Sequence, residues 1–226
     1  MKVFLGFDAR EPEACRVAAK TLKQTSGIEP EWLNVDRLRD VGLLNRPTDR
    51  RGQCYDLISS AHFSTDFHVS RFMVPIICQS GWALFADADV VFIRDVREML
   101  YEADPDKAVM VVQHDHQPSN PWKMESRRQT NYTRKNWSSV MLFNVDHAAN
   151  KRLTVHDVNT RKGLDLHNLY WLHDREIGEL RPCWNWLVNE TEMPENPGIA
   201  HFTNGGPFTA RWKGAKHDDI WLEAAQ

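Results

Sequence analysis

Cysteine is scarce in this chain: four cysteines, at positions 15, 54, 78 and 183, occur among 226 residues. They lie far apart and form no Cys-x-x-Cys pair, so the small disulfide-rich class of protein is excluded. Each one lies in an apolar setting, which favours reduced residues in a core. The cysteine pattern therefore predicts a cytoplasmic protein.

Long apolar runs are also missing. No stretch approaches 18 consecutive apolar residues, so no membrane-spanning segment is predicted. The apolar run at the N-terminus meets Asp8 too early to be a signal peptide. The formal net charge is −3, whereas a general nucleic-acid binder needs an excess of basic residues to neutralise phosphates. We expect neither a membrane segment nor a nucleic-acid partner.

Several catalytic motifs are absent as well. The sequence contains no nucleophile elbow, no P-loop and no Gly-x-Gly-x-x-Gly motif. It also lacks a recognisable order of serine, histidine and aspartate for a catalytic triad. These absences remove the simplest hydrolase, kinase and dehydrogenase interpretations. What is present is an ordinary globular composition, with 42% hydrophobic and 26% charged residues, and an unusual nine tryptophans. Tryptophan occurs both in cores and on surfaces that face sugars. The many tryptophans are also compatible with an interface between copies of the chain in a homo-oligomer.

The distribution of apolar residues predicts a single α/β domain over 1–226. Runs that read as strands buried on both faces occur at 3–7, 82–86, 108–113 and 140–143, with a further short strand at 31–35. A helix should start at Pro12 and stop at Gly27, which gives the strand–turn–helix beginning of a βαβ unit. Further helices are expected at 68–79, 95–102, 147–153, 164–172 and 217–225.

Asp87-Ala88-Asp89 follows one of these buried strands. In extended backbone the two carboxylates would point the same way, about 7 Å apart. Open α/β sheets bind ligands where their strands end, and two oxygen ligands there suit Mg²⁺ or Mn²⁺ bound together with a substrate's phosphates. The alternative is a solvated turn with two acids, although the apolar runs on both sides favour a buried site.

His201 is a second candidate metal ligand, in a short apolar run before Gly205 and Gly206. Its imidazole could complete a metal shell, and the two glycines could let backbone N–H groups approach a phosphate. The alternative is a hydrogen-bonded core histidine. Together with Asp87 and Asp89, the ligand interpretation is the favoured one.

Three other charged residues each have two interpretations. Asp8 ends the first strand and would either bind a nucleobase or ribose, or cap the following helix. Arg71 would either reach a phosphate or ribose, or form a surface salt bridge. Asp174 would either face the reacting carbon of a sugar, or serve as a cap or ion-pair partner.

The segment from 115 to 136 is polar and basic. A loop of this length inside a compact domain is either disordered or functional. Residues 118–135, with Trp122 and Tyr132, could fold over a bound donor as a lid, or could bind an acidic or glycan acceptor. The preceding His114-Asp115-His116 is interpreted as a loop that lines the cleft rather than as a second metal site.

Taken together, these motifs resemble the family 8 glycosyltransferases. The motifs that carry the resemblance are Gly6-Phe7-Asp8, Ser70-Arg71-Phe72-x-x-Pro75, the run 84–91, the run 139–144 and His201-Phe202-x-x-Gly205-Gly206-Pro207-Phe208. They cover most of the chain in the right order. Where that family has an Asn-x-Gly before its central strand, this chain has Trp137-Ser138-Ser139.

The resemblance implies the A-type glycosyltransferase fold, with a Rossmann-like mixed sheet flanked by helices. Residues 1–93 would form the nucleotide-binding half and 94–226 the half for acceptor and sugar. The metal ligands would be Asp87, Asp89 and His201. The nucleotide sugar would be contacted by Phe7, Asp8, Arg71, Asp87, Gly205 and Gly206. The residues near the transferred sugar would be Asp174 and Asn185.

The activity implied is metal-dependent transfer of a hexose to a glycan, glycolipid or protein hydroxyl. The donor would be a nucleotide diphosphate sugar linked to UDP, the cation Mn²⁺ or Mg²⁺, and the anomeric configuration would be retained. From the residues alone, two other classes stay open. An Asp-x-Asp pair also occurs in metal-dependent phosphohydrolases and nucleotidyltransferases, and a carbohydrate-binding protein without catalysis would explain the tryptophans.

Overall fold

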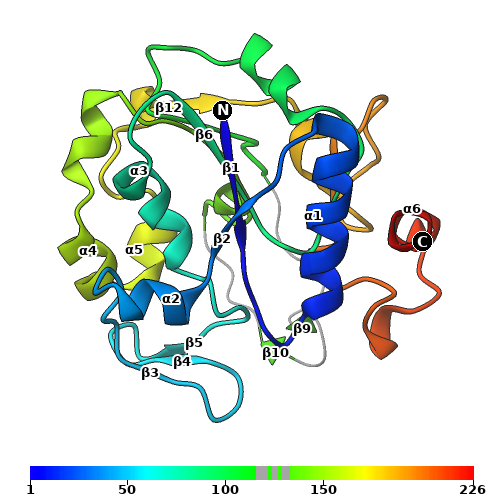
Figure 1. The fold of residues 1–226 in the computed structure, drawn as a ribbon, viewed down its shortest axis with the longest axis horizontal. Helices are drawn as coiled ribbons and strands as arrows, with labels where there is room; N and C mark the ends of the chain where they lie inside the picture. Colours follow the sequence, from blue (N-terminus) through cyan, green and yellow to red (C-terminus); the bar gives the residue numbers. More distant parts are fainter. Residues whose placement is uncertain (116–121, 124–126, 129–132) are drawn as a thin grey trace.

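The computed structural model describes residues 1–115, 122–123, 127–128 and 133–226 (Figure 1). Its centre is a six-stranded mixed sheet, which confirms the predicted α/β class. In spatial order the strands are β12 (Ile177–Glu179), β8 (Val109–Val111), β11 (Val140–Asn144), β6 (Trp82–Ala86), β1 (Lys2–Gly6) and β2 (Glu31–Leu33).

The sheet is buried on both faces, as its apolar strands predict. β1 pairs in parallel with both β2 and β6, and β11 is antiparallel to its neighbours β6 and β8. Successive side chains of a strand point to opposite faces. Phe4 and Phe85 therefore enter one core cluster, while Leu5 and Leu84 enter another on the opposite face. This double burial explains why the strands lack an apolar–polar alternation.

Helices cover both faces of this sheet, with α1 on one side and α3, α4 and α5 on the other (Figure 1). The α-helices are α1 (Pro12–Ser26), α2 (Val35–Asp40), α3 (Val74–Ile77), α4 (Val155–Thr160), α5 (Gly163–His167) and α6 (Asp218–Ala225). Short 3₁₀ helices are η1 (Ser70–Met73), η2 (Val96–Tyr101), η3 (Trp137–Ser139), η4 (Ala148–Arg152), η5 (Asp174–Glu176), η6 (Pro182–Asn185) and η7 (Ala210–Trp212).

Helix α1 has the limits that its sequence predicts. Pro12 occupies the first turn, where its missing N–H is not needed. Gly27 ends the helix in the left-handed conformation, with φ 67°, and its N–H donates to the carbonyl of Lys23. Ala18 and Leu22 pack against the sheet. The strand–turn–helix start of the chain is therefore confirmed.

Two other predicted helices are shorter than expected. The segment 68–79 contains the 3₁₀ helix η1 followed by α3, because Pro75 in the first turn of α3 has no N–H to continue a single helical ladder. The segment 164–172 is helical only to His167, and Leu169 adopts a positive φ of 55° that breaks the helix.

Three smaller sheets complete the described structure. One consists of β13 (Trp186–Leu187), β14 (Ile199–His201) and β7 (Val90–Phe92). Another consists of β3 (Thr48–Asp49), β4 (Tyr55–Asp56) and β5 (Ala61–His62). The third is the pair β9 (Trp122–Lys123) and β10 (Arg127–Arg128), inside the segment that was expected to be a loop.

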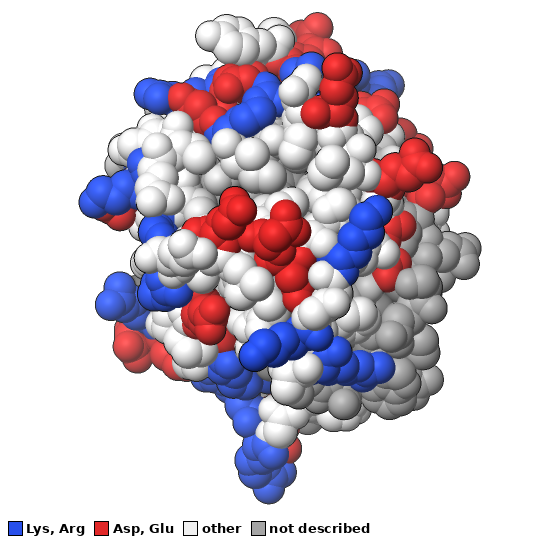
Figure 2. Space-filling model, turned by 90° about the vertical axis from the view of Figure 1, so that its right-hand side faces the viewer, with Lys and Arg blue, Asp and Glu red and all other residues white. Residues whose placement is uncertain are grey.

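Figure 2 shows the face of the molecule on the side of α6, where acidic and basic side chains are interspersed. Within the described residues, no helix combines the length and the apolar character that crossing a membrane would require. All four cysteines are free and buried, as their apolar settings predict. The division into a 1–93 half and a 94–226 half stays a prediction.

Candidate metal centre

Asp87-Ala88-Asp89 joins two different sheets. It begins directly after β6, in the six-stranded sheet, and ends where β7 enters the three-stranded sheet. The chain bends at Ala88 and Asp89, so the expected straight extended backbone is wrong at this point. Asp87 is held at the sheet edge by its N–H, which donates to the carbonyl of Ser139 at 2.9 Å. The change of sheet is thus what creates the bend.

Strand pairing brings His201 to this bend from more than 100 residues away. β14 pairs antiparallel with β7, so that His201 lies opposite Val90. The N–H of Phe202 then donates to the carbonyl of Asp89 at 2.8 Å. The contact between the acids and the histidine is therefore fixed by the backbone ladder, and does not depend on a flexible loop.

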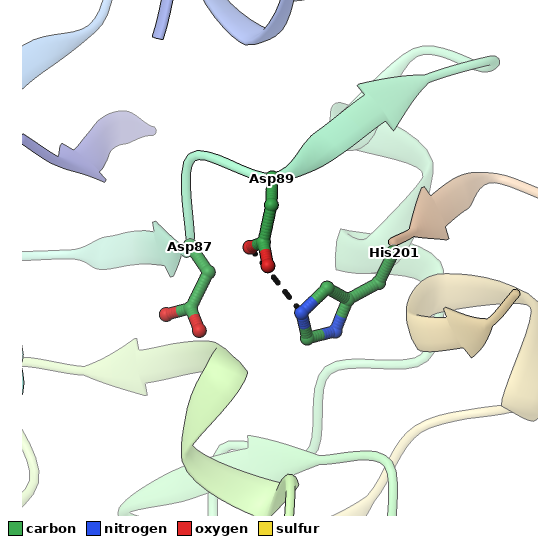
Figure 3. Close-up of side chains that lie close together, drawn as sticks. All are labelled: Asp87, Asp89 and His201. Carbon is green, nitrogen blue, oxygen red and sulfur yellow. Dashed lines mark ion pairs between the residues drawn. The ribbon is translucent and has the colours of Figure 1, made fainter. Parts of the chain in front are cut away.

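The three side chains converge on one point (Figure 3). One ligand atom from each of Asp87, Asp89 and His201 lies within 4.8 Å of the others. His201 Nε2 is 3.4 Å from Asp89 Oδ1. The exposed fractions of the three residues are 5%, 2% and 1%. Two carboxylates so close together in a buried site repel one another unless a positive charge lies between them.

This set of donors fits a divalent cation. Two carboxylate oxygens and one imidazole nitrogen, converging from two sheets, leave coordination positions for the oxygens of a substrate. Oxygen-rich sets of this kind suit Mn²⁺ or Mg²⁺. Asp87, Asp89 and His201 would hold the ion, and its charge would offset the repulsion between the two acids.

Asn185 lies behind His201 and orients its ring. The Asn185 Nδ2 donates to the carbonyl of Asn136 at 3.1 Å and to Ser139 Oγ at 3.0 Å. Asn185 Oδ1 must therefore be the atom that faces His201 Nδ1, at 3.0 Å. An amide oxygen only accepts, so Nδ1 carries the proton and the lone pair of a neutral imidazole lies on Nε2, toward Asp89.

Asn185 was predicted to lie near the transferred sugar. The structure places Asn185 against His201, with an exposed fraction of 0%, and its nearness to the sugar stays a prediction. It acts through His201 and is a positioning residue in this arrangement. Its sequence context, a Trp-Asn-Trp in a predicted core, carries no signal that distinguishes these two roles.

Arg71 binds one of the acids directly. Its Nη1 is 2.9 Å from Asp87 Oδ1 and donates to the carbonyl of Ser138 at 2.7 Å. The guanidinium lies over the rings of Phe67 and Phe85, 5.3 and 5.0 Å from their centroids. Arg71 is 4% exposed, so the alternative of a surface salt bridge is wrong.

Asp8 lies at the same sheet edge as Asp87, because β1 and β6 are parallel neighbours. It does not cap α1, since the residue at the cap is Glu11. Its carboxylate accepts from Arg10 at 2.6–3.0 Å and from the N–H of Asp66 at 3.1 Å. Burial alone would raise the pKa of Asp8, but these bonds and the Arg10 charge outweigh burial and hold that pKa below its usual value.

The other predicted nucleotide contacts are Phe7, Gly205 and Gly206, and each lies close to an aromatic side chain of this chain. Phe7 packs edge-on against Trp32, with ring centroids 5.9 Å apart. Gly205 has a φ of 120°, and a Cβ there would approach Trp212 to 2.5 Å. A Cβ on Gly206 would lie 2.7 Å from Phe208. The backbone at Gly205 therefore favours glycine, whereas a side chain at Gly206 would require the Phe208 ring to shift. Contact of these three residues with a nucleotide stays a prediction.

Asp174 is exposed, unlike the three converging residues. Its side chain is 92% exposed and is paired with Arg134 at 2.6 Å. The ion-pair interpretation is thus the one that the contacts show, and a role at the sugar stays a prediction. His116 and most of the 118–135 segment lie outside the described residues, as does Tyr132.

A cavity of about 350 Å³ adjoins the candidate metal centre and includes Asp87 and Arg71 in its lining. Its other described walls come from the segments 59–68, 135–139 and 162–167. Among these other residues, the sequence predicted a functional role only for Lys135, which ends the 118–135 segment that could form a lid or bind an acceptor. The departure Trp137-Ser138-Ser139 from the family pattern is a second signal within the 135–139 wall.

Comparison with known proteins finds a relative in Arabidopsis thaliana. The chain is 38% identical, over 229 aligned positions, to Protein CDI of Arabidopsis thaliana, and the match covers 98% of this chain and 84% of that protein. The chain belongs to the CDI family. No protein-family model matches it.

Similarity to solved structures shows which fold this chain has. An active-site mutant of LgtC matches 100% of this chain and 95% of that one, with a TM-score of 0.60 and 14% identity. The glycosyltransferase GlyE of Streptococcus pneumoniae matches 99% of this chain, with a TM-score of 0.61 and 12% identity, and this chain spans 59% of the GlyE chain. Mouse xyloside xylosyltransferase 1 matches 88% of this chain and 96% of its own, with a TM-score of 0.52 and 12% identity.

These matches confirm the resemblance to family 8 glycosyltransferases at the level of the fold. The CDI-family chain has the A-type glycosyltransferase fold over its whole length. At identities below 25% such likeness does not carry an activity with it. The functional conclusion therefore depends on the residues of the metal centre.

Proposed function

We propose that this chain is a metal-dependent glycosyltransferase, which moves a hexose from a nucleotide diphosphate sugar to a hydroxyl acceptor. The observation that carries the proposal is the convergence of Asp87, Asp89 and His201 within 4.8 Å, at a strand end of a glycosyltransferase fold. Nucleotides bind at this edge in open α/β sheets. The adjoining cavity provides room for the sugar.

The chain's own residues prepare this site in two ways. Asn185 keeps the lone pair of His201 directed toward Asp89, and Arg71 holds Asp87 in place. A bound Mn²⁺ or Mg²⁺ would supply positive charge to the departing diphosphate. The cavity walls would hold the acceptor hydroxyl against the anomeric carbon, which is the positioning part of catalysis.

Finer points of the proposal come from the family resemblance. The donor is UDP-linked, and the reaction retains the anomeric configuration. The nucleotide lies along the ends of β1 and β6, near Phe7 and Asp8, with its phosphates toward Gly205 and Gly206. The acceptor is a glycan, glycolipid or protein hydroxyl. Cytoplasmic location and a homo-oligomeric state stay predictions of the sequence.

The proposal is tested by binding and by turnover. The full chain is mixed with MnCl₂ and a panel of nucleotide sugars, and its melting temperature and the release of nucleoside diphosphate are measured. A ligand of the native state raises the melting temperature. Asp89→Asn should remove the stabilisation that depends on Mn²⁺, and Asp106→Asn, a change at an exposed aspartate, is the matched control.

Three results would contradict the proposal. One is unchanged turnover in Asp89→Asn after treatment with a chelator. A second is release of inorganic phosphate or pyrophosphate in place of nucleoside diphosphate, which would identify a phosphohydrolase or nucleotidyltransferase. Heat of sugar binding that does not depend on metal, without turnover, would indicate a carbohydrate-binding protein.

A further inference from the structure

The turn before β11 contains a residue whose backbone is left-handed although it is not glycine. Asn136 has φ 65° and ψ 1°. This conformation costs free energy for any residue with a Cβ, although asparagine tolerates it better than most. Residues held in this way occur often at functional sites, where the surrounding contacts fix them. Asn136 is buried, so its neighbours hold it in this conformation.

The conformation of Asn136 closes a tight turn. The N–H of Trp137 donates to the carbonyl of Arg134 at 3.2 Å, which makes Asn136 the third residue of a four-residue turn. A type II turn has a left-handed residue at its third position, where glycine and asparagine are common. The N–H of Ser139 then donates to the carbonyl of Asn136 at 3.3 Å. Asn136 therefore sets the path of residues 136–139, here called the 136–139 turn.

The first carbonyl of the 136–139 turn supports His201. The carbonyl of Asn136 accepts from Asn185 Nδ2 at 3.1 Å and from Ser139 Oγ at 2.6 Å. Ser139 Oγ accepts in turn from Asn185 Nδ2 at 3.0 Å. Both acceptors of this amide nitrogen are thus placed by one backbone group. The amide oxygen of Asn185 is left for His201 Nδ1, at 3.0 Å.

Two further carbonyls of the same turn hold Asp87. The carbonyl of Ser138 accepts from Arg71 at 2.7 Å, and Arg71 lies 2.9 Å from Asp87 Oδ1. The carbonyl of Ser139 accepts from the N–H of Asp87 at 2.9 Å. Peptide groups are planar and each residue has only two soft torsions, so a change at the start of the turn would displace the carbonyls that follow. One turn therefore supports two of the three candidate metal ligands.

We propose that Asn136 is a positioning residue of the metal centre, and that it acts through its left-handed backbone rather than through its side chain. This conformation directs the carbonyl groups of the 136–139 turn toward Asn185, Arg71 and Asp87 before a cation binds. Contacts of this kind orient metal ligands and raise their affinity for the metal. The inference rests on the metal centre of the proposed function, and does not depend on which sugar or acceptor is used.

Three substitutions that differ in their preference for left-handed backbone test the proposal. Asn136→Gly keeps the conformation without steric cost, Asn136→Ala disfavours it, and Asn136→Val disfavours it most, because valine is β-branched. All three remove the side-chain amide, so a role of the amide predicts an equal loss in each. A role of the backbone predicts an affinity for Mn²⁺ close to that of the parent chain in Asn136→Gly, and a loss of about ten-fold or more in Asn136→Val.

Two measurements on the full chain follow the series. The affinity is measured by titrating the metal-free chain with MnCl₂, followed by electron paramagnetic resonance. The imidazole ¹⁵N chemical shifts of His201 without metal should report a proton on Nδ1 in Asn136→Gly, and a mixture of tautomers in Asn136→Val. A general loss of stability would not change which nitrogen carries the proton. If Asn136→Val does not fold, Asn136→Ala against Asn136→Gly provides the comparison, because the two differ by one methyl group.

Asn189 provides a matched control. It is also an asparagine with φ 65°, it is exposed, and its amide donates to the carbonyl of Lys216 at 2.9 Å. Asn189→Val should lower the melting temperature and leave both the affinity for Mn²⁺ and the His201 tautomer unchanged. Equal affinities in folded Asn136→Gly, Asn136→Ala and Asn136→Val would overturn the proposal. So would a loss in Asn136→Gly as large as that in Asn136→Val, because the side chain would then be the active part.

Failure of the proposed function gives a different pattern. If the parent chain binds Mn²⁺ and the variants follow the expected series, but no nucleotide sugar binds or turns over, glycosyl transfer is wrong and the role of Asn136 stands. If the parent chain binds no Mn²⁺, the metal centre is wrong, and this inference is rejected with it.

Discussion

His201 Nδ1 lies 3.0 Å from the amide oxygen of Asn185, and this single contact sets which nitrogen of the ring can bind a metal. The amide cannot turn over, because its nitrogen already donates to the carbonyl of Asn136 and to Ser139 Oγ. Ser139 Oγ itself donates to the same carbonyl at 2.6 Å. The tautomer of His201 is thus determined by a short network that starts in the segment before β11.

Asn185→Leu is the first prediction that follows. The change keeps the side-chain volume close but removes the acceptor for Nδ1–H, so the ring loses its preferred tautomer. We expect the affinity for Mn²⁺ to fall by about 10–100-fold, as for other partners of metal-binding histidines. The measurement is titration of the metal-free chain with Mn²⁺, followed by electron paramagnetic resonance.

The imidazole ¹⁵N chemical shifts of His201 provide a readout that a loss of packing would not change. In the parent chain they should report a proton on Nδ1 without any metal, and in Asn185→Leu a mixture of tautomers. Asn185→Asp keeps an acceptor and should recover the Nδ1–H form. A parent chain with its proton on Nε2 would show that the inferred orientation is wrong.

Arg71→Met is expected to destabilise the chain more when metal is absent than when it is present. Without the guanidinium, Asp87 stays buried beside Asp89 and loses its ion pair with Arg71, and breaking a buried pair usually costs about 3–5 kcal/mol. Mn²⁺ should restore part of this loss. Urea unfolding with and without MnCl₂ measures both effects.

A matched control is Arg97→Met, which removes an ion pair at the surface. Its effect on the free energy of unfolding should stay below about 1 kcal/mol and should not respond to Mn²⁺. If Arg71→Met were equally mild, or equally insensitive to metal, Asp87 would not depend on Arg71 for its charge balance.

Much of the fold could be predicted because it follows from local patterns. The apolar runs of β1, β6 and β11 and the limits of α1 at Pro12 and Gly27 can be read directly from the sequence. The sequence also allowed one set of metal ligands to be proposed, namely Asp87, Asp89 and His201. Their convergence required the pairing of β7 with β14, which a motif search suggests but does not establish.

The rest of the site could not be predicted because it depends on long-range contacts. Nothing in the residues around Asn185 indicates that its amide would face His201. Nor do the residues around Arg71 indicate that its guanidinium would be buried against Asp87. The exposure of Asp174 is a similar case, since an ion pair with Arg134 leaves no local pattern in the sequence. Such contacts appear only when the elements are packed.

Asp174 also provides a direct comparison of two interpretations. Because its side chain is 92% exposed and paired with Arg134, we expect Asp174→Asn to leave the rate of transfer close to that of the parent chain. Arg134→Met should behave in the same way if the pair has only a surface role. A loss of about 100-fold or more in Asp174→Asn alone would instead support the predicted role at the reacting carbon, because electrostatic stabilisation of a transition state contributes on that scale.

A second buried ion pair, between Arg46 and Asp56, should contribute to the stability of the fold. Arg46 donates to Asp56 at 2.7 and 2.5 Å, and to the carbonyls of Val158 and Arg161. Both side chains are at most 1% exposed. Arg46→Met should lower the free energy of unfolding by about 3–5 kcal/mol. The exposed pair of Arg51 with Asp49 is the control, where Arg51→Met should cost less than about 1 kcal/mol.

His68 should make stability depend on pH. Burial lowers the pKa of His68 to about 3, a shift that Asp56 opposes and Arg46 and Arg71 reinforce. The unfolded chain takes up a proton near pH 6.5, and the folded chain does not until about pH 3. Stability is therefore highest above pH 6.5 and falls as the pH drops toward 3, by at most about 1.4 kcal/mol per pH unit from this group.

His68→Phe isolates this contribution. The ring can still stack on Phe63, whose centroid lies 3.7 Å from that of His68, but it cannot titrate. Between about pH 6.5 and 4.5 the free energy of unfolding of the variant, measured in urea, should fall less steeply than that of the parent chain. His62→Gln, at an exposed histidine, should keep the parent slope. Equal slopes in the parent and in His68→Phe would mean that His68 is protonated in the folded chain, and the burial argument would then be wrong.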